Sequence, residues 1–206
     1  SGQYNTGLGT FALYSNTTGS ESTAVGYQAG YSNTTGRITA MGRHAVKNNT
    51  TAVEVTGIGY RALRDNTTGQ YNTSVGGDAL MQNTTANNNT AVGYQAGYTN
   101  TTGNNLSALG YRAGYSMTTG GENTFVGRES GYGTTTGYRN TYLGYYSGRN
   151  ASTGYQNTFV GDTCGEDMTS GSRNTILGRF NGNQGGLDIR TSSNNIVLSD
   201  GDGNPR

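Results

Sequence analysis

The sequence predicts an all-β fold, a parallel β-solenoid of about eleven coils. Three observations support this. A motif that ends in glycine recurs every 17 residues, the residue before that glycine is always aliphatic or Met, and the repeats are rich in Thr, Asn and Gly. A fixed period of this length is typical of a solenoid, in which each repeat forms one coil stacked on the previous coil.

The motif reads polar residue, Thr or Ser, variable residue, aliphatic residue, Gly. Its glycines are Gly9, Gly26, Gly42, Gly59, Gly76, Gly93, Gly110, Gly127, Gly144, Gly161 and Gly178, at steps of 17, 16, then 17 eight times. With 36 Gly and 31% hydrophobic residues, composition alone resembles that of a disordered chain. Disorder has no reason to keep one position apolar in eleven copies. That position, the aliphatic row, holds Leu8, Val25, Met41, Ile58, Val75, Val92, Leu109, Val126, Leu143, Val160 and Leu177.

Each coil is predicted to contain two short strands and two turns. In the first half, Thr23 and Val25 point one way while Ala24 and Gly26 point the other, and we expect the aliphatic row to fill the inside of the coil. In the second half, Asn and Gly suit corners and Thr a short strand, whereas frequent Gly, Thr and Asn oppose a helix. Asn residues that share one position predict an amide ladder: Asn72, Asn89, Asn123, Asn140, Asn157 and Asn174.

The position two before the motif glycine, the variable row, predicts self-association. It is small in the first seven copies and large in the last four. Small residues allow another backbone to approach closely, and exposed Phe or Ile demands burial. One coil also holds too few aliphatic side chains to offset the ordering of its backbone. We therefore expect a homotrimer, with an interface formed by Ala24, Ala40, Ser74, Ala91, Ala108, Phe125, Tyr142, Phe159 and Ile176.

Two further rows are rich in aromatic and basic residues and are predicted to face outward. Neighbouring members of a row should touch, as Tyr94 with Tyr111, Arg43 with Tyr60, and Asp162 with Arg179. One interpretation is that stacking and cation–π contacts protect the coil edges. The other is a surface that contacts polysaccharide, formed by Tyr27, Tyr31, Tyr94, Tyr98, Tyr111 and Tyr115.

The sequence offers little catalytic chemistry. No carboxylate pair recurs, His44 has no matching Ser or Cys partner, and Cys164 occupies a position otherwise held by Ala or Ser. Asp200, Asp202 and Asn204 match the start of a calcium loop, but Pro205 replaces the required glycine, so a turn is favoured. We therefore predict no enzyme activity, no metal site and no cofactor. A net charge of +1 without a basic cluster argues against nucleic-acid binding, and no apolar run approaches the ~20 residues of a membrane span.

Two regions are predicted: residues 1–183 as the repeat array, and residues 184–206 as a junction that contains a strand over 194–199 and a turn. The repeats, such as the stretch 89–97 followed by Asn100-Thr101-Thr102-Gly103, resemble the YadA-like head repeats of trimeric autotransporter adhesins, which also occur in bacteriophage tail fibres. The resemblance implies a left-handed parallel β-roll, three chains wide, with the motif strand facing the trimer centre. These coils are longer than the adhesin unit.

The junction resembles the one that precedes a C-terminal chaperone domain in phage tail fibres. We therefore expect a structural and adhesive rod of a trimeric tail fibre, located in the virion or at a cell surface, with itself and host polysaccharide as partners. The head of a bacterial adhesin is one alternative. An ice-binding solenoid is another, although flat Thr-x-Thr pairs are missing because Thr34 and Thr35 are adjacent and face opposite sides.

Overall fold

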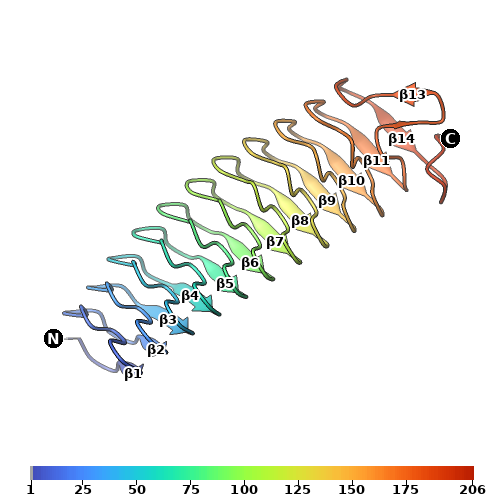
Figure 1. Ribbon diagram of the computed structural model, residues 1–206. Helices are drawn as coiled ribbons and strands as arrows, with labels where there is room; N and C mark the ends of the chain where they lie inside the picture. The colour runs from blue at the N-terminus through green and yellow to red at the C-terminus, as the bar shows by residue number, and fades with distance from the viewer. Residues whose placement is uncertain (1) are drawn as a thin grey trace.

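The 17-residue repeat forms one coil of a straight rod, and the coils stack along its axis (Figure 1). The computed structural model describes residues 2–206, so the first residue of the predicted repeat array lies outside the described part. Within residues 2–206 the structure is a parallel β-solenoid of about eleven coils without helices, as predicted. The strands are β1 (Thr6–Leu8), β2 (Thr23–Val25), β3 (Ile38–Met41), β4 (Val55–Ile58), β5 (Thr73–Val75), β6 (Thr90–Val92), β7 (Ser107–Leu109), β8 (Thr124–Val126), β9 (Thr141–Leu143), β10 (Thr158–Val160), β11 (Thr175–Leu177), β12 (Asn183–Gln184), β13 (Leu187–Asp188) and β14 (Ile196–Leu198).

One long parallel sheet runs along one side of the rod. Strands β1 to β11 pair in chain order and β14 follows β11, while β12 and β13 form a separate antiparallel pair. The register places each motif position on the same position of the next coil, for example Thr90 on Ser107 and Val92 on Leu109. At about 4.8 Å per strand the sheet is roughly 50 Å long.

The two faces of this sheet are the reverse of those predicted. From Ala24 onwards the variable row points into the coil, where its members are buried within one chain, and the aliphatic row points out. The predicted interface residues Ala24, Ala40, Ser74, Ala91, Ala108, Phe125, Tyr142, Phe159 and Ile176 are each 0% exposed. Their assignment to a face between chains is therefore wrong, because no part of these side chains remains at the surface to meet a partner.

The change from small to large residues in the variable row is explained by packing inside the coil. Six positions after each variable-row residue lies a second inward position, which we name the turn row. It holds Leu80 after Ser74, but Gly131 after Phe125. A Cβ on Gly131 would lie 2.7 Å from ring carbons of Phe125. A large side chain therefore enters the interior from one row or from the other.

Some coils are small in both rows, and there a third position supplies the volume. Ala24 is followed by Gly30, and Ala91 by Gly97. A Cβ on Gly30 would lie 2.6 Å from Cδ1 of Ile38, and one on Gly97 would lie 3.0 Å from Cδ2 of Leu106. Side chains from these three positions together fill the interior, and two of them can contribute in one coil, as Val46 and Val55 do. This is consistent with the close packing of protein cores.

Each coil contains one strand rather than the two predicted. The Thr-Thr segment forms a turn because the Asn before it and the Gly after it close on each other: Asn33 Nδ2 donates to the carbonyl of Gly36 at 2.8 Å. The amides of Thr34 and Thr35 both donate to the carbonyl of Thr50, at 2.9 and 3.3 Å, which a regular strand pairing does not allow.

The predicted amide ladder is present and buried. The side-chain oxygen of each Asn accepts from the backbone N–H at the same position of the next coil, as from Asn140 to Asn123 at 2.9 Å. A second ladder, which the sequence did not reveal, joins side chain to side chain. In it, Asn66 Nδ2 donates to Asn49 Oδ1 at 3.0 Å and Asn83 Nδ2 donates to Asn66 Oδ1 at 2.7 Å. Both ladders satisfy buried polar groups at the corners.

The backbone hydrogen bonds between coils do not all point the same way along the rod. The amides of Gly93 and Gln95 donate to the preceding coil, at 2.8 and 2.9 Å. The amides of Gly97, Thr99 and Thr101 donate to the following coil, at 2.9 to 3.1 Å. Each coil therefore sends donors towards both ends of the rod.

The repeat is interrupted after β11. The chain leaves the coil path as the short hairpin β12–β13, returns, and adds β14 to the long sheet next to β11 (Figure 1). The strand expected over 194–199 forms at Ile196–Leu198. The turn expected after it also forms, since Asp200 Oδ1 accepts from the amides of Asp202 and Asn204 at 3.1 and 2.9 Å.

Candidate binding surfaces

The outer face of the long sheet carries two parallel rows of side chains. One is the aliphatic row. Six of its members are exposed: Leu8 66%, Met41 42%, Ile58 37%, Val92 40%, Leu109 40% and Leu177 41%. The other five, Val25, Val75, Val126, Leu143 and Val160, are half-buried. The other row is formed by the residue two before each member of the aliphatic row, which is mostly Thr, and we name it the strand-threonine row. Its members are half-buried or exposed. The row ends at β14 with Ile196, which is 81% exposed. A continuous apolar stripe of this length is unusual on a monomeric protein.

The tyrosines predicted to contact polysaccharide form two separate groups. Tyr27 and Tyr31 lie near the N-terminal end, where Tyr31 stacks on Tyr14 at 5.1 Å and Tyr27 lies 6.5 Å from Phe11. The group in the middle of the rod has Tyr94 on Tyr111 at 5.8 Å and Tyr98 on Tyr115 at 5.1 Å between ring centroids. The structure brings the six predicted residues together within each group but not across the two groups.

Stacking along these rows covers both faces of one ring, that of Tyr115. Tyr115 lies between Tyr98 and Tyr132, 5.1 Å from each, with interplanar angles of 5° and 9°. Both faces of this ring are therefore covered by its neighbours along the rod, and burial raises the pKa of its phenol. The Arg112 guanidinium lies 5.1 Å from the Tyr111 ring and 5.5 Å from the Tyr115 ring, so it links the two rows.

The contacts expected between neighbouring members are confirmed. Besides Tyr94 with Tyr111, Arg43 lies 5.9 Å from the Tyr60 ring, and Arg179 Nε lies 3.3 Å from Asp162 Oδ2. These contacts join consecutive coils on the outer surface, as the interpretation based on coil-edge protection requires.

His44 and Cys164 have environments that fit structural roles. Partial burial, followed by the charges of Lys47 and Arg43, lowers the pKa of the His44 imidazole below its usual range. Burial raises the pKa of the Cys164 thiol to about 12, and its Sγ lies 3.2 Å from the carbonyl oxygen of Ile176. A buried thiol of this kind is unreactive at neutral pH.

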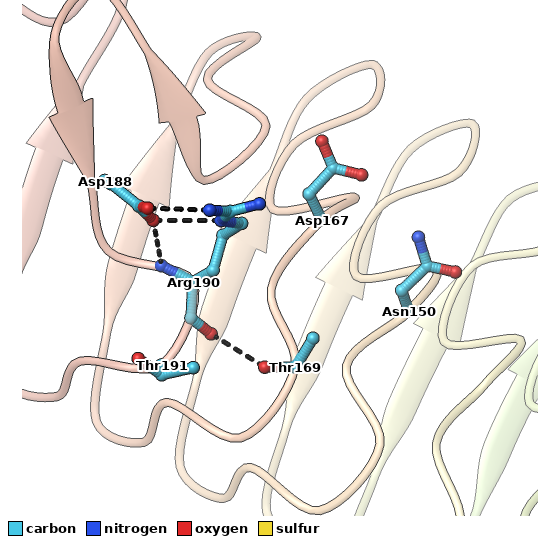
Figure 2. A pocket seen from close by; sticks show the side chains of 6 residues that line it. All are labelled: Asn150, Asp167, Thr169, Asp188, Arg190 and Thr191. Carbon is cyan, nitrogen blue, oxygen red and sulfur yellow. Dashed lines mark hydrogen bonds and ion pairs between the residues drawn. The ribbon is translucent and has the colours of Figure 1, made fainter.

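A polar pocket lies where the hairpin β12–β13 approaches the last regular coils. Its volume is about 620 Å³, and its lining residues are Asn150, Asp167, Thr169, Asp188, Arg190 and Thr191. Figure 2 shows that Asn150 and Asp167 project from neighbouring coils on the side where Asp188 and Arg190 lie. None of the six residues belongs to the long sheet.

The pocket contains one tight ion pair. Arg190 Nε and Nη2 donate to Asp188 at 3.0 and 2.8 Å, and hydrogen bonds from Arg190 hold the pKa of Asp188 below its usual range. Asp167 accepts one hydrogen bond at Oδ2, from Asn181 Nδ2 at 2.9 Å. Thr169 Oγ1 donates to the carbonyl of Arg190 at 3.3 Å, which ties the hairpin to the coil below it (Figure 2).

No family model, curated protein or solved structure matches this chain. Within residues 2–206 no helix is long and apolar enough to cross a membrane. The same residues contain no cluster of three or more His, Cys, Asp or Glu side chains suited to a metal ion.

The pocket could not be predicted from the sequence because some of its residues lie inside the repeat array and others lie beyond it. Asn150 and Asp167 occupy one position of the repeat, and their spacing of 17 predicts that they are neighbours. Asp188 and Arg190 lie beyond the last motif glycine, where no repeat position fixes their place. The outward aliphatic row was also missed, because alternation along a strand groups residues by face without saying which face is inside.

Proposed function

We propose that this chain is a rod segment of a trimeric bacteriophage tail fibre that supports attachment to the host surface, with a structural rather than catalytic role. One observation carries the proposal: the aliphatic row runs along the outer face of the whole sheet, and each of its members is exposed or half-buried in a single chain. In a trimer around a common axis, the aliphatic row of each chain would be buried against those of the other two chains. The trimer predicted from the sequence is thereby kept, but its interface moves from the variable row to the aliphatic row.

Burial of the aliphatic row supports association energetically. Each fully buried Val, Leu or Ile side chain contributes about 1.5–3 kcal/mol relative to an exposed one. The members retain only part of their exposure in a single chain, such as 40% for Val92 and Leu109, so each contributes a fraction of that value. Repetition over eleven coils makes the sum favourable without any single strong contact.

YadA-like repeats occur in both classes of protein, and it is the junction-like C-terminal segment that favours a phage fibre over the head of a bacterial adhesin. Mass spectrometry of purified virions tests this choice. Recovery of peptides from this chain in the particle supports a tail fibre, and their recovery only from bacterial outer membranes supports an adhesin.

An ice-binding solenoid remains a second candidate, and a specific observation favours it. The strand-threonine row and the aliphatic row lie side by side on one exposed face, in register, with one residue of each per strand. Such a regular array of hydroxyl and methyl groups suits ordered water. The two functions use the same face and exclude each other, because a trimer covers what an ice binder must expose.

Sedimentation equilibrium separates the two candidates. A fibre segment should have three times the 21.5 kDa mass of one chain, at all protein concentrations in the micromolar range, and no thermal hysteresis. A stable 21.5 kDa species would contradict the fibre proposal. The same species with measurable thermal hysteresis would establish the ice-binding alternative.

The tyrosine rows are proposed mainly to brace the coils, and Tyr115 has no free face on which a sugar could stack. Sugars stack on free aromatic faces, and the face of Tyr115 on each side is taken by another tyrosine. In a trimer centred on the aliphatic row, the turns far from the sheet would face outward. The polar pocket lies on this outer side, which makes it the better candidate for contact with a host ligand.

A further inference from the structure

The pocket beside the hairpin β12–β13 exists because the repeat breaks there. In the regular array each coil covers the previous one, so the outer surface continues from coil to coil without an overhang. After Asn181 the chain extends as the hairpin and returns at Arg190, whose carbonyl accepts from the amide of Thr169 at 2.9 Å. The concave wall is therefore built by the departure from the 17-residue period, and none of its lining residues belongs to the long sheet.

The polar groups in the pocket have unused hydrogen-bonding capacity of both kinds. Asp167 keeps Oδ1 as a free acceptor, since its one partner binds Oδ2. Asn150 makes no side-chain hydrogen bond among the described residues, so its amide offers a donor and an acceptor. Arg190 keeps Nη1, and Thr191 keeps its hydroxyl. A matching ligand therefore needs hydrogen-bond donors and acceptors close together, as the hydroxyl groups of a sugar provide.

The wall of the pocket is held in place before any ligand arrives. The two hydrogen bonds from the Arg190 side chain to Asp188, and the bond from Asn181 to Asp167, restrict three charged side chains, although Arg190 and Asp188 are about half exposed. Side chains that are already ordered lose less conformational entropy on binding. The volume of about 620 Å³ also falls within the usual range of small-molecule sites.

The balance of charge selects against an anionic ligand. Asp188 already neutralises Arg190, and the carboxylate of Asp167 has no basic partner, so the pocket carries a net negative charge. An acidic sugar would meet this carboxylate, whereas the hydroxyl groups of a neutral sugar donate to it. The coil spacing of about 4.8 Å is close to the length of one pyranose residue, so Asn150 and Asp167 can each meet a successive sugar.

We propose that this pocket binds a short segment of a neutral polysaccharide, with Asp167 accepting from sugar hydroxyls and Asn150 and Arg190 donating to them. The proposal gives the proposed fibre a specific host contact and rests on that function for its biological meaning. The binding itself is a property of the isolated chain.

Isothermal titration calorimetry with defined oligosaccharides tests the proposal. The probes are the neutral maltotetraose, cellotetraose and chitotetraose, and the acidic tetragalacturonate. We expect at least one neutral probe to bind the unmodified protein, and tetragalacturonate to bind about tenfold more weakly or not at all. Absence of binding by all three neutral probes, or stronger binding of the acidic one, would overturn the proposal.

Two variants and a matched control locate the site. Asn150→Ala and Asp167→Asn should each weaken binding about tenfold, because a hydrogen bond to the sugar is lost in each. Gln82→Ala removes a side chain at the same repeat position of a distant coil and should leave binding unchanged. Equal binding by all four proteins, or equal loss in Gln82→Ala, would show that the pocket is not the site.

Two measurements keep folding and oligomeric state apart from binding. Melting temperatures should agree among the variants, since Asn150 has no side-chain partner to lose and Asn at position 167 still accepts from Asn181 through its carbonyl oxygen. Should Asp167→Asn melt earlier, Asn150→Ala alone decides the outcome. A monomeric mass with intact sugar binding would refute the trimeric fibre and leave the pocket standing, whereas a trimer without sugar binding would refute only the pocket.

Discussion

The environment of Tyr142 illustrates how side chains pack inside this solenoid. Its ring is fully buried and stacks between Phe125 and Phe159, with centroids 5.2 and 4.8 Å away. Its hydroxyl is the one buried side-chain polar atom in residues 2–206 without a hydrogen bond of normal geometry, although the Asn157 side chain lies near it. Burial raises the pKa of this phenol far above its usual range, so the group stays neutral. The hydroxyl destabilises the fold by the free energy of burying a polar group without a hydrogen bond.

Replacing Tyr142 with Phe should therefore stabilise the protein. The ring keeps both stacking partners, and loss of the unpaired hydroxyl removes a penalty of about 1–3 kcal/mol. Chemical denaturation should show a higher free energy of unfolding. The matched control is Tyr138→Phe, whose ring is 42% exposed and should change stability little. Destabilisation by Tyr142→Phe would mean that the hydroxyl has a partner after all.

At the scale of one coil, the sequence determined which residues share a face but not which face is inside. The alternation Thr90-Ala91-Val92 correctly separated Ala91 from its neighbours. Aliphatic residues normally fill a core, so Val92 was assigned to it and Ala91 to the surface. The interior is narrow and already receives side chains from the turn row, such as Leu80, so small residues suffice on the strand. To decide which face is inside, one has to know that the variable row and the turn row, six residues apart, fill the same interior space.

Because the variable row and the turn row share one interior space, a substitution in one row should be compensated by a substitution in the other. Phe159→Ala should cost about 3–5 kcal/mol by leaving a cavity. Gly165→Leu should also destabilise, because a Cβ there would lie 2.5 Å from Cδ2 of Phe159. The double variant reproduces the pattern of Ser74 with Leu80, where Leu tolerates a φ of 46°. We expect it to be more stable than the sum of the single changes by about 1–3 kcal/mol.

A pair without contact serves as the control. Combining Phe125→Ala with Gly165→Leu places the cavity and the new side chain two coils apart, so their effects should add. Equal coupling in both double variants, measured by denaturant unfolding, would contradict the volume rule and point to a general loss of cooperativity.

At the scale of the whole molecule, the aliphatic row should decide whether chains associate. Val92→Lys combined with Leu109→Lys places two charges where three chains would meet, at a cost of several kcal/mol for each buried unpaired charge. Sedimentation should then report a mass of 21.5 kDa in place of three times that value. The coil itself should remain folded, since both side chains point outward in one chain.

The corresponding control places the same charges on the opposite side. Thr102 and Thr119 are exposed at equivalent positions of consecutive turns, far from the long sheet, so Thr102→Lys with Thr119→Lys should leave the mass of the assembly unchanged. Dissociation by both double variants would indicate that added positive charge, and not its location, weakens association.

Across the molecule, the repeat made the outer rows predictable and left the C-terminal site unpredictable. A fixed period placed Tyr94 against Tyr111, because equal positions on consecutive coils must stack. Arg190 lies 21 residues from Thr169, although its carbonyl takes the place that the period assigns to a residue 17 further on. The four added residues belong to the hairpin that builds the pocket wall. No pattern in the sequence predicts the path of this hairpin.

The opposed directions of the hydrogen bonds between coils have an electrostatic consequence. In an α-helix all peptide dipoles align, and charge of about half a unit gathers at each end. Here Gly93 and Gln95 point their N–H groups one way and Gly97, Thr99 and Thr101 the other, so the dipoles of one coil largely cancel. No macrodipole grows as coils are added. A rod of this kind can be lengthened by whole coils while its two ends stay electrically almost alike.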